Sequence, residues 1–233
     1  MVGGTPGKWS GRMLCAAAHD RPTLHPVMAH KRVARTTIAR LPKYLAYLEG
    51  LDEHTATVSS QQLATGAAVK DAIVRRDMSD LGITGTRGVG YGVADLIARL
   101  HGELGSAEER AVIIVGAGHF GHALANYDGF GAAGFELVGV YDVSPNRIGM
   151  AFESITVSDV ADLEADIADH DVSMAIVTVP AGAAQEVVDR LVAAGIRSIL
   201  SFAPTTLSHP EDVDVRHVDL SSELQVLAYF NKQ

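Results

Sequence analysis

The first half of the chain carries apolar residues at the three- and four-residue spacing of a helix. Ile38, Leu41, Leu45 and Leu48 fall on one face at this spacing, which predicts an amphipathic helix over residues 36–48. Pro42 fits best within the first turn of a helix, so we expect the regular helix to begin near it.

Residues 57–82 predict two short helices on either side of a tight turn. Ser59 is followed three residues later by Gln62, a capping box that starts a helix running to about Thr65. A second helix follows the turn, and Gly82 and Gly85 end it. This helix carries Val69, Ile73 and Val74 inward and Arg75, Arg76 and Asp77 partly outward. The pattern predicts a helix-turn-helix over residues 43–82, whose second helix enters the major groove of DNA.

A glycine-rich segment, residues 85–92, follows the helix-turn-helix. Glycines at this density fit a tight hairpin whose backbone comes close to a neighbour, with Arg87 at its tip. A basic hairpin beside a recognition helix describes the wing of a winged helix, which we place at residues 83–92, and a closing helix is expected at 93–104. A solvated cluster of surface charges is the alternative reading of Arg75, Arg76 and Arg87, but the order of elements favours the winged helix.

The second half alternates between buried strands and amphipathic helices. Strands are predicted at residues 111–115, 135–141, 174–180, 197–202 and 213–218, and helices from residue 123 onward, at 160–167 and at 181–194. This alternation predicts an α/β fold, a doubly wound parallel Rossmann sheet over residues 106–219, with ligands outside the carboxyl ends of its strands. A last apolar helix, residues 220–230, either packs locally or reaches a partner subunit.

The residues after the first of these strands form a dinucleotide-binding motif. They read Gly116-Ala117-Gly118-His119-Phe120-Gly121, a Gly-x-Gly-x-x-Gly loop. Asp142 follows 21 residues after Gly121, at the end of the second strand, where a carboxylate takes the hydroxyls of the adenine ribose. Its charge would repel a 2′-phosphate, so NADH and NAD+ are the expected cofactors. We expect Thr178, Val179 and Pro180 beside the nicotinamide, because they lie at the end of a later strand.

The strand ends offer no acid–base group for hydride transfer. They carry Thr178, Ser201 and Thr205, whereas a dehydrogenase needs an oriented His, Lys or Tyr beside the hydride. There are no paired histidines at metal-ligand spacing and only one cysteine, so neither a catalytic nor a metal site is predicted. Two alternatives stay open: a small NAD-dependent oxidoreductase with a helical appendage, and a nucleotide-binding module of a larger complex, like that of acyl-CoA ligases.

Composition adds a sharp division of charge between the two halves. Residues 1–105 hold 13 Lys and Arg against 9 Asp and Glu, a net charge of +4, whereas residues 106–233 hold 6 against 19, a net charge of −13. This asymmetry indicates a polyanion-facing module joined to an acidic one. Residues 1–30 are expected to be a disordered tail in which Met13 or Met28 could be the natural start. No apolar run approaches the roughly 20 residues that cross a membrane, so the cytoplasm is the expected compartment.

Separated motifs follow one another along most of the chain in a fixed order. They are Arg40-Leu41-Pro42, Val58-Ser59-Ser60, Val74-Arg75-Arg76-Asp77, residues 85–91, the glycine loop, Phe202-Ala203-Pro204 and Val218-Asp219-Leu220. With this set, which runs from about Thr37 to Lys232, the chain resembles the Rex family of bacterial redox-sensing transcriptional repressors.

The resemblance implies a homodimer that binds palindromic operator DNA when NAD+ prevails and releases it when NADH rises. A winged-helix domain over residues 31–105 would hold the DNA, and paired Rossmann domains would form the core. The C-terminal helix, within residues 220–233, would be swapped onto the partner subunit. DNA contact is assigned to Lys43, Ser59, Arg75, Arg76 and Arg87. Tyr127 and Asp219 match a tyrosine and an aspartate that exchange partners across the dimer as the nicotinamide changes state.

Four positions depart from the family pattern. Ala46 stands where some members have an arginine that joins the aspartate switch, and Thr84 replaces a tyrosine before the wing. Asp80 puts an acid beside the recognition helix, and His119 replaces a common loop asparagine. We expect these positions to alter operator preference and redox sensitivity rather than the fold.

Overall fold

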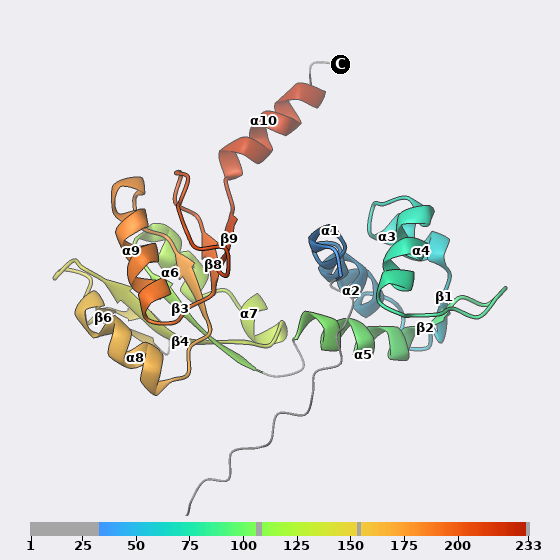
Figure 1. Ribbon diagram of the computed structural model, residues 1–233, viewed down its shortest axis with the longest axis horizontal. Coiled ribbons are helices and arrows are strands. Elements are labelled where there is room, and N and C mark those ends of the chain that lie inside the picture. The colour runs from blue at the N-terminus through green and yellow to red at the C-terminus, as the bar shows by residue number, and fades with distance from the viewer. Residues whose placement is uncertain (1–32, 106–108, 153–154, 232–233) are drawn as a thin grey trace, which may run out of the picture.

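The chain forms a helical N-terminal unit and a C-terminal unit built on a sheet (Figure 1). The computed structural model describes residues 33–105, 109–152 and 155–231; the predicted tail, with Met13 and Met28, lies outside them.

The N-terminal unit is a winged helix-turn-helix. Its helices are α1 (Arg35–Ile38), α2 (Leu41–Glu49), α3 (Ser60–Gly66), α4 (Asp71–Asp80) and α5 (Val93–Leu104), and the strands β1 (Thr57–Val58) and β2 (Tyr91–Gly92) pair antiparallel. Pro42 lies in the first turn of α2, as predicted. The predicted capping box forms, since the Gln62 amide donates to Ser59 Oγ (3.2 Å) and the Ser59 amide donates to Gln62 Oε1 (2.9 Å).

The apolar face predicted from residue spacing makes the core of this unit. Leu41, Leu63, Val74 and Leu96 are buried and come from four different helices. Burial of each such side chain contributes roughly 1.5–3 kcal/mol, so these four hold the helices around one another.

The prediction that Asp77 faces partly outward is wrong. Its side chain is fully buried on α4, whereas its neighbours Arg75 and Arg76 are exposed. The helix places residue 77 almost opposite residue 75, on the same face as Val74 and Met78. A charged residue is buried there because other polar side chains reach it, as described below.

The turn between α3 and α4 has its left-handed residue at Ala68, with φ +54°. A side chain in this conformation costs about 1–2 kcal/mol, which glycine avoids. Gly66 lies at the end of α3 instead, where a Cβ atom would overlap the ring of Tyr47.

The C-terminal unit contains a seven-stranded sheet in the order β5-β6-β4-β3-β7-β8-β9. The strands are β3 (Arg110–Val115), β4 (Phe135–Asp142), β5 (Ala151–Phe152), β6 (Ile155–Asp159), β7 (Met174–Val177), β8 (Ser198–Ser201) and β9 (Asp214–His217). All neighbours are parallel except β5 and β6. In the centre, Ile114 lies opposite both Val140 and Ile176. This is the predicted doubly wound Rossmann sheet.

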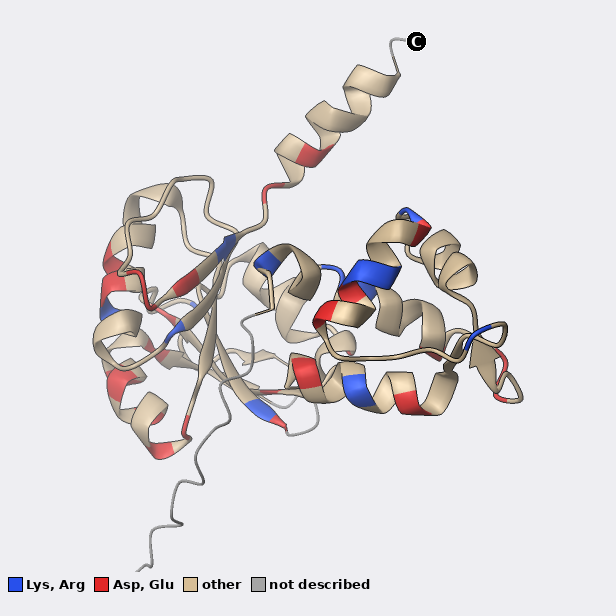
Figure 2. Ribbon diagram, turned by 45° about the vertical axis from the view of Figure 1, so that its right-hand side comes forward, with Lys and Arg blue, Asp and Glu red and all other residues tan. Residues whose placement is uncertain are grey.

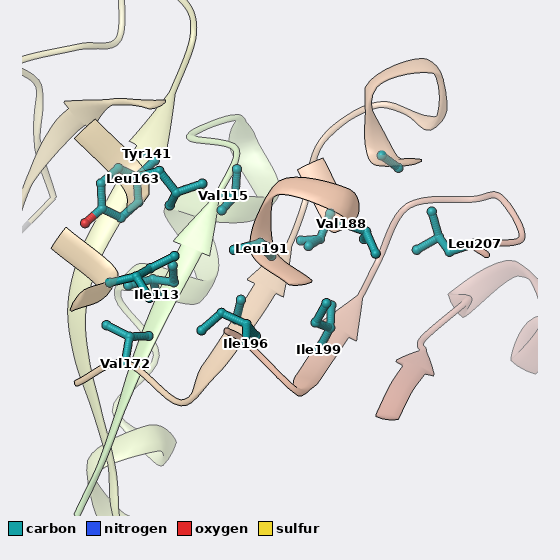
Figure 3. Packing of buried hydrophobic residues seen from close by; sticks show 14 of the residues in the cluster. Ile113, Val115, Tyr141, Leu163, Val172, Val188, Leu191, Ile196, Ile199 and Leu207 are labelled. Carbon is teal, nitrogen blue, oxygen red and sulfur yellow. The ribbon is translucent and has the colours of Figure 1, made fainter. Parts of the chain in front are cut away.

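Alternate residues of the central strand β3 enter two separate cores. Ile113 and Val115 pack with residues of α8 (Leu163–Asp169) and α9 (Ala181–Ala193), the packing drawn in Figure 3. Val112 and Ile114 face the other side, toward α6 (His119–Ala125) and α7 (Gly129–Ala132). A parallel strand buried on both faces explains the unbroken apolar run that predicted it.

Some boundaries differ from the prediction. Helix α6 begins at His119 rather than Ala123, because the Gly118 carbonyl already accepts the His122 amide (2.9 Å). Strand β7 ends at Val177, and Pro180 caps α9, so residues 178–180 form a loop. The predicted helix at 160–167 starts as a 3-10 turn, η1 (Val160–Asp162), before α8. Strands β5 and β6 were not predicted.

The last helix, α10 (Leu220–Phe230), has the predicted bounds and stands away from the rest of the chain (Figure 1). Its apolar side chains are exposed, with Leu224 66% and Leu227 63% accessible. Within the single chain it therefore does not pack locally. None of the helices among the described residues is long and apolar enough to span a bilayer.

Candidate functional site

The glycine loop packs tightly against the end of β7. Gly116 has φ +110°, a backbone conformation that favours glycine, and a Cβ atom on Gly121 would overlap the Gly116 carbonyl oxygen. Thr178 Oγ1 donates to the same carbonyl (2.7 Å), which ties the loop to β7. The close approach of strand, loop and helix is the geometry that the first and third glycines of a dinucleotide motif provide.

A cavity of about 550 Å³ opens beside this loop, at the carboxyl ends of the parallel strands. Six of the predicted cofactor residues line it: Gly116, Gly118, Asp142, Thr178, Val179 and Pro180. Phe202 and Pro204, which follow β8, line the same cavity and were not predicted. Its place in the sheet is where Rossmann proteins hold a dinucleotide.

Asp142 lies at the end of β4 but is largely withdrawn from the cavity. Its side chain is 5% exposed and accepts hydrogen bonds from the amides of Ala117 (2.7 Å) and Ser144 (2.8 Å). Arg147 also donates to Asp142 Oδ2, at 3.2 Å. The carboxylate therefore fixes the glycine loop and the turn after β4, besides lining the cavity.

The other predicted loop residues lie around the cavity rather than in it. Ala117 and His119 line a second hollow of about 290 Å³, which shares Gly118 and Arg147 with the first. The Phe120 ring is 40% exposed and contacts Phe202, with ring centroids 4.7 Å apart. Arg147, in both linings, was missed because its contact with Asp142 depends on the turn between them.

The recognition helix and the wing share one groove. Arg75 on α4 and Arg87 in the wing, with Ser59 at the start of α3, line a hollow of about 450 Å³. The wing is closed by a hydrogen bond from the Thr86 amide to the Gly90 carbonyl (2.7 Å), and Arg87 lies between these two residues. Three of the five predicted DNA-binding residues thus meet at one surface.

Arg75 is held in place inside this groove. Its Nη2 pairs with Asp71 (2.6 Å) one turn earlier on α4, and its Nε donates to Ser60 Oγ (3.2 Å) on α3. Its side chain still has 67% of its surface exposed, so the guanidinium is positioned and accessible together.

The remaining two predicted DNA residues are exposed on neighbouring helices. Arg76 is 83% exposed and lies 3.9 Å from Asp80, one turn further along α4, and Lys43 is exposed on α2. Figure 2 shows basic side chains on the N-terminal unit and acidic side chains along the outer helices of the sheet unit. The charge division of the sequence is therefore a division between two faces of function.

The buried Asp77 ties the recognition helix to the N-terminal helices. It accepts hydrogen bonds from Arg40 Nη2 (2.6 Å), Arg40 Nε (2.7 Å), Tyr44 Oη (2.7 Å) and Thr37 Oγ1 (3.0 Å). Burial alone would raise the pKa of Asp77, but these donors outweigh it and hold the pKa below its usual range. Sequence spacing gives no signal for contacts between residues about 40 positions apart.

The structure does not bring the two predicted switch residues together within one chain. Tyr127 is 59% exposed, with its ring 5.2 Å from that of Phe130. Asp219 caps α10, where it accepts from the Ser221 amide (2.9 Å) and Ser222 Oγ (2.7 Å), and these bonds lower its pKa. Any exchange between them needs a second subunit.

The chain was compared with known protein families and curated relatives. Residues 32–79 match the family described as a putative DNA-binding protein N-terminus, and residues 107–205 match the CoA binding domain. The redox-sensing transcriptional repressor Rex of Streptomyces griseus is 49% identical over 212 residues, which cover 91% of this chain and 84% of the relative. The chain belongs to the Rex family.

Solved structures agree with this membership. RSP, a Rex-family repressor, shares 36% identity and a TM-score of 0.77 over 84% of this chain and 92% of its own. Its complex with β-NADH gives a TM-score of 0.76 over 85% and 93% of the two chains, at 36% identity. Its complex with β-NAD+ and operator DNA gives 0.79 over 84% and 91%, at 37% identity.

Proposed function

We propose that this Rex-family chain represses transcription by binding operator DNA and leaves the operator when NADH occupies its Rossmann cavity. The observation that carries the proposal is the presence of two sites in one chain: the basic groove of Arg75 and Arg87, and the cavity beside the glycine loop. RSP has been crystallised both with NADH and with NAD+ and operator DNA, which supports the same two ligands here.

On the DNA side, α4 enters the major groove and the wing follows the backbone. Arg75, clamped by Asp71 and Ser60, is assigned to base edges, because a positioned guanidinium can bond two acceptors of guanine. Arg76, Arg87, Lys43 and Ser59 are assigned to phosphates and groove edges. An ordered arginine and a mobile one on the same helix support this division of tasks.

On the cofactor side, the redox state acts through a shift between two populations. A ligand moves such an equilibrium only if it binds one state better than the other. The reduced nicotinamide is neutral, so it can enter the apolar end of the cavity at Val179, Phe202 and Pro204 with less cost than the cationic ring. We infer that NADH favours the dimer geometry that cannot span an operator.

The working unit is inferred to be a homodimer with α10 exchanged between subunits. Leu224 and Leu227 leave α10 with an apolar surface that its own chain does not cover. The sheet face beside α7 carries an apolar hollow of about 230 Å³, lined by Phe130 and Met174 among others. A second subunit would cover both surfaces and would bring a partner's Asp219 toward Tyr127.

The cofactor is proposed to be sensed and not turned over. At the expected nicotinamide end the hydroxyl of Thr178 donates to a backbone carbonyl, and the other lining residues, Val179, Pro180, Phe202 and Pro204, carry no acid–base side chain. As a repressor it would act in the cytoplasm, where bacterial DNA lies.

The test is to remove the recognition arginines and measure both ligands. Arg75→Ala with Arg76→Ala is expected to abolish binding to a palindromic Rex-type operator and to leave NADH binding unchanged, because the two sites use separate residues. The matched control is Arg99→Ala, an exposed arginine paired with Asp95 on α5 (3.5 Å), which should keep operator binding. Loss of both ligands in the double variant, or operator binding that survives it, would contradict the proposal.

A further inference from the structure

We propose that the hollow formed by His119, His122 and Arg147 is a subsite for a phosphate ester on the adenosine ribose. The chain would then accept a ribose-phosphorylated adenine nucleotide at the same loop that takes NAD(H). The inference rests on the proposed cofactor site, since the subsite adjoins the cavity at Gly118 and Arg147.

The carboxylate that should exclude such a phosphate is screened. Asp142 is only 5% exposed, and its oxygens accept from two backbone amides and from Arg147. A carboxylate excludes a 2′-phosphate when it faces the ribose with unpaired oxygens. Here Arg147 stands over it and offsets its charge, so the main ground for excluding phosphorylated cofactors is weakened.

Arg147 presents donors to the place where the phosphate would lie. Its side chain is 46% exposed and lines both hollows, and one N–H of its guanidinium goes to Asp142 at 3.2 Å. A guanidinium has five N–H donors in a planar fork that matches phosphate oxygens. In Rossmann proteins an arginine near the acidic position is the group that accommodates a 2′-phosphate.

Two histidines complete the lining with further donors. His119 and His122 lie on the first turn of α6, and the His122 ring is held edge-on against Phe152, with centroids 4.5 Å apart. Each neutral imidazole offers one N–H to an anion. Ala117, Met150 and Phe152 form the apolar remainder of a hollow of about 290 Å³.

The chemistry recognised is a phosphomonoester on the adenosine ribose, and it has two natural sources. NADPH carries it on the 2′ oxygen and coenzyme A on the 3′ oxygen. The positions of Arg147 and the histidines do not depend on which oxygen bears the phosphate, so both ligands enter the test.

The experiment measures NADH and NADPH binding by fluorescence, and coenzyme A by displacement of NADH, on the full chain. The wild-type chain is expected to bind NADPH or coenzyme A. Arg147→Gln should weaken that binding by about 10- to 100-fold while changing NADH affinity by less than about threefold, because a charged hydrogen bond to phosphate is lost. His119→Gln with His122→Gln should give a smaller loss in the same direction.

The matched control is Arg197→Gln. Arg197 is 49% exposed and pairs with Asp212 at 3.0 Å, as Arg147 does with Asp142, but it lines neither hollow. It should leave all affinities unchanged. NADH binding without measurable NADPH or coenzyme A binding, or equal losses of NADH and NADPH in Arg147→Gln, would overturn the subsite alone. Absence of NADH binding in the wild type would overturn the cofactor site itself.

Discussion

Asp142 anchors the glycine loop through a single carboxylate at the end of β4. The amide of Ala117, in the middle of the loop, points at it from 2.7 Å. The motif predicts a ribose ligand at this position, and the geometry adds a second task, because the loop amide would otherwise lack a buried acceptor. Removal of the carboxylate would therefore disturb the loop as well as the ribose contact.

We expect Asp142→Ala to weaken NADH binding by about tenfold or more, which is the scale of one charged hydrogen bond. Binding is measured by nicotinamide fluorescence. Asp189→Ala is the control, since Asp189 is an exposed aspartate of α9 that accepts one hydrogen bond from Gln185 (2.8 Å). Unchanged NADH affinity in Asp142→Ala would remove Asp142 from the cofactor site.

At the scale of elements, α4 is fixed from behind by Asp77. The folded-state pKa of Asp77 lies below the value of about 4 that an unfolded aspartate has, so its stabilisation is present above about pH 4. It is lost as the pH falls through the lower, folded-state pKa. Above pH 4 the ionised carboxylate joins α1, α2 and α4.

Asp77→Asn should lower the free energy of unfolding by about 3 kcal/mol at pH 7, because Arg40 loses its charged partner in a buried network. The loss should shrink as the pH falls below about 4, where the wild-type carboxyl is protonated too. Urea unfolding at several pH values measures it. Asp95→Asn, at an exposed pair, should cost less than about 1 kcal/mol. Equal costs at both positions would show that the network adds no stability.

Helix α10 makes a prediction about assembly. Leu224→Glu with Leu227→Glu should convert the protein from dimer to monomer, because the charges would have to be buried against a partner. Light scattering after size exclusion measures the mass, and Gln225→Glu, on the same helix, is the control that should stay dimeric. A wild-type monomer, or a variant that remains a dimer, would contradict the exchanged helix.

Elements with strong local signals were predictable from the sequence. The bounds of α5 and α10 agree with the prediction at both ends, because each helix has a sharp start and stop, such as Gly92 before and Gly105 after α5. Strands β5 and β6 were missed because they are short and lie at the sheet edge, where only one side is paired.

The parts of the sites that depend on distant contacts were not predictable. Gly116, Gly121 and Thr178 followed from the motif and from the rule about strand ends. Asp77 looked like part of a polar run, and its partner Arg40 is 37 residues away. Arg147 gained its place only from a turn that folds back onto Asp142. Sequence patterns report the face and the type of an element, but they do not report which polar groups meet.

At the scale of the whole molecule, one chain joins a unit that suits DNA to an acidic unit that suits a dinucleotide. The net charges of +4 and −13 in the two halves fit these tasks. An acidic body repels DNA except where the basic groove meets it, which orients the approach. Communication between the two units requires that the cofactor change how two subunits are arranged.

The most direct test is an operator-binding titration by fluorescence anisotropy at constant salt, with NADH and NAD+ added in turn. The account predicts that NADH dissociates the protein from a palindromic operator and that NAD+ leaves it bound. NADH that binds the protein, as its own fluorescence would report, without lowering operator occupancy would contradict the account.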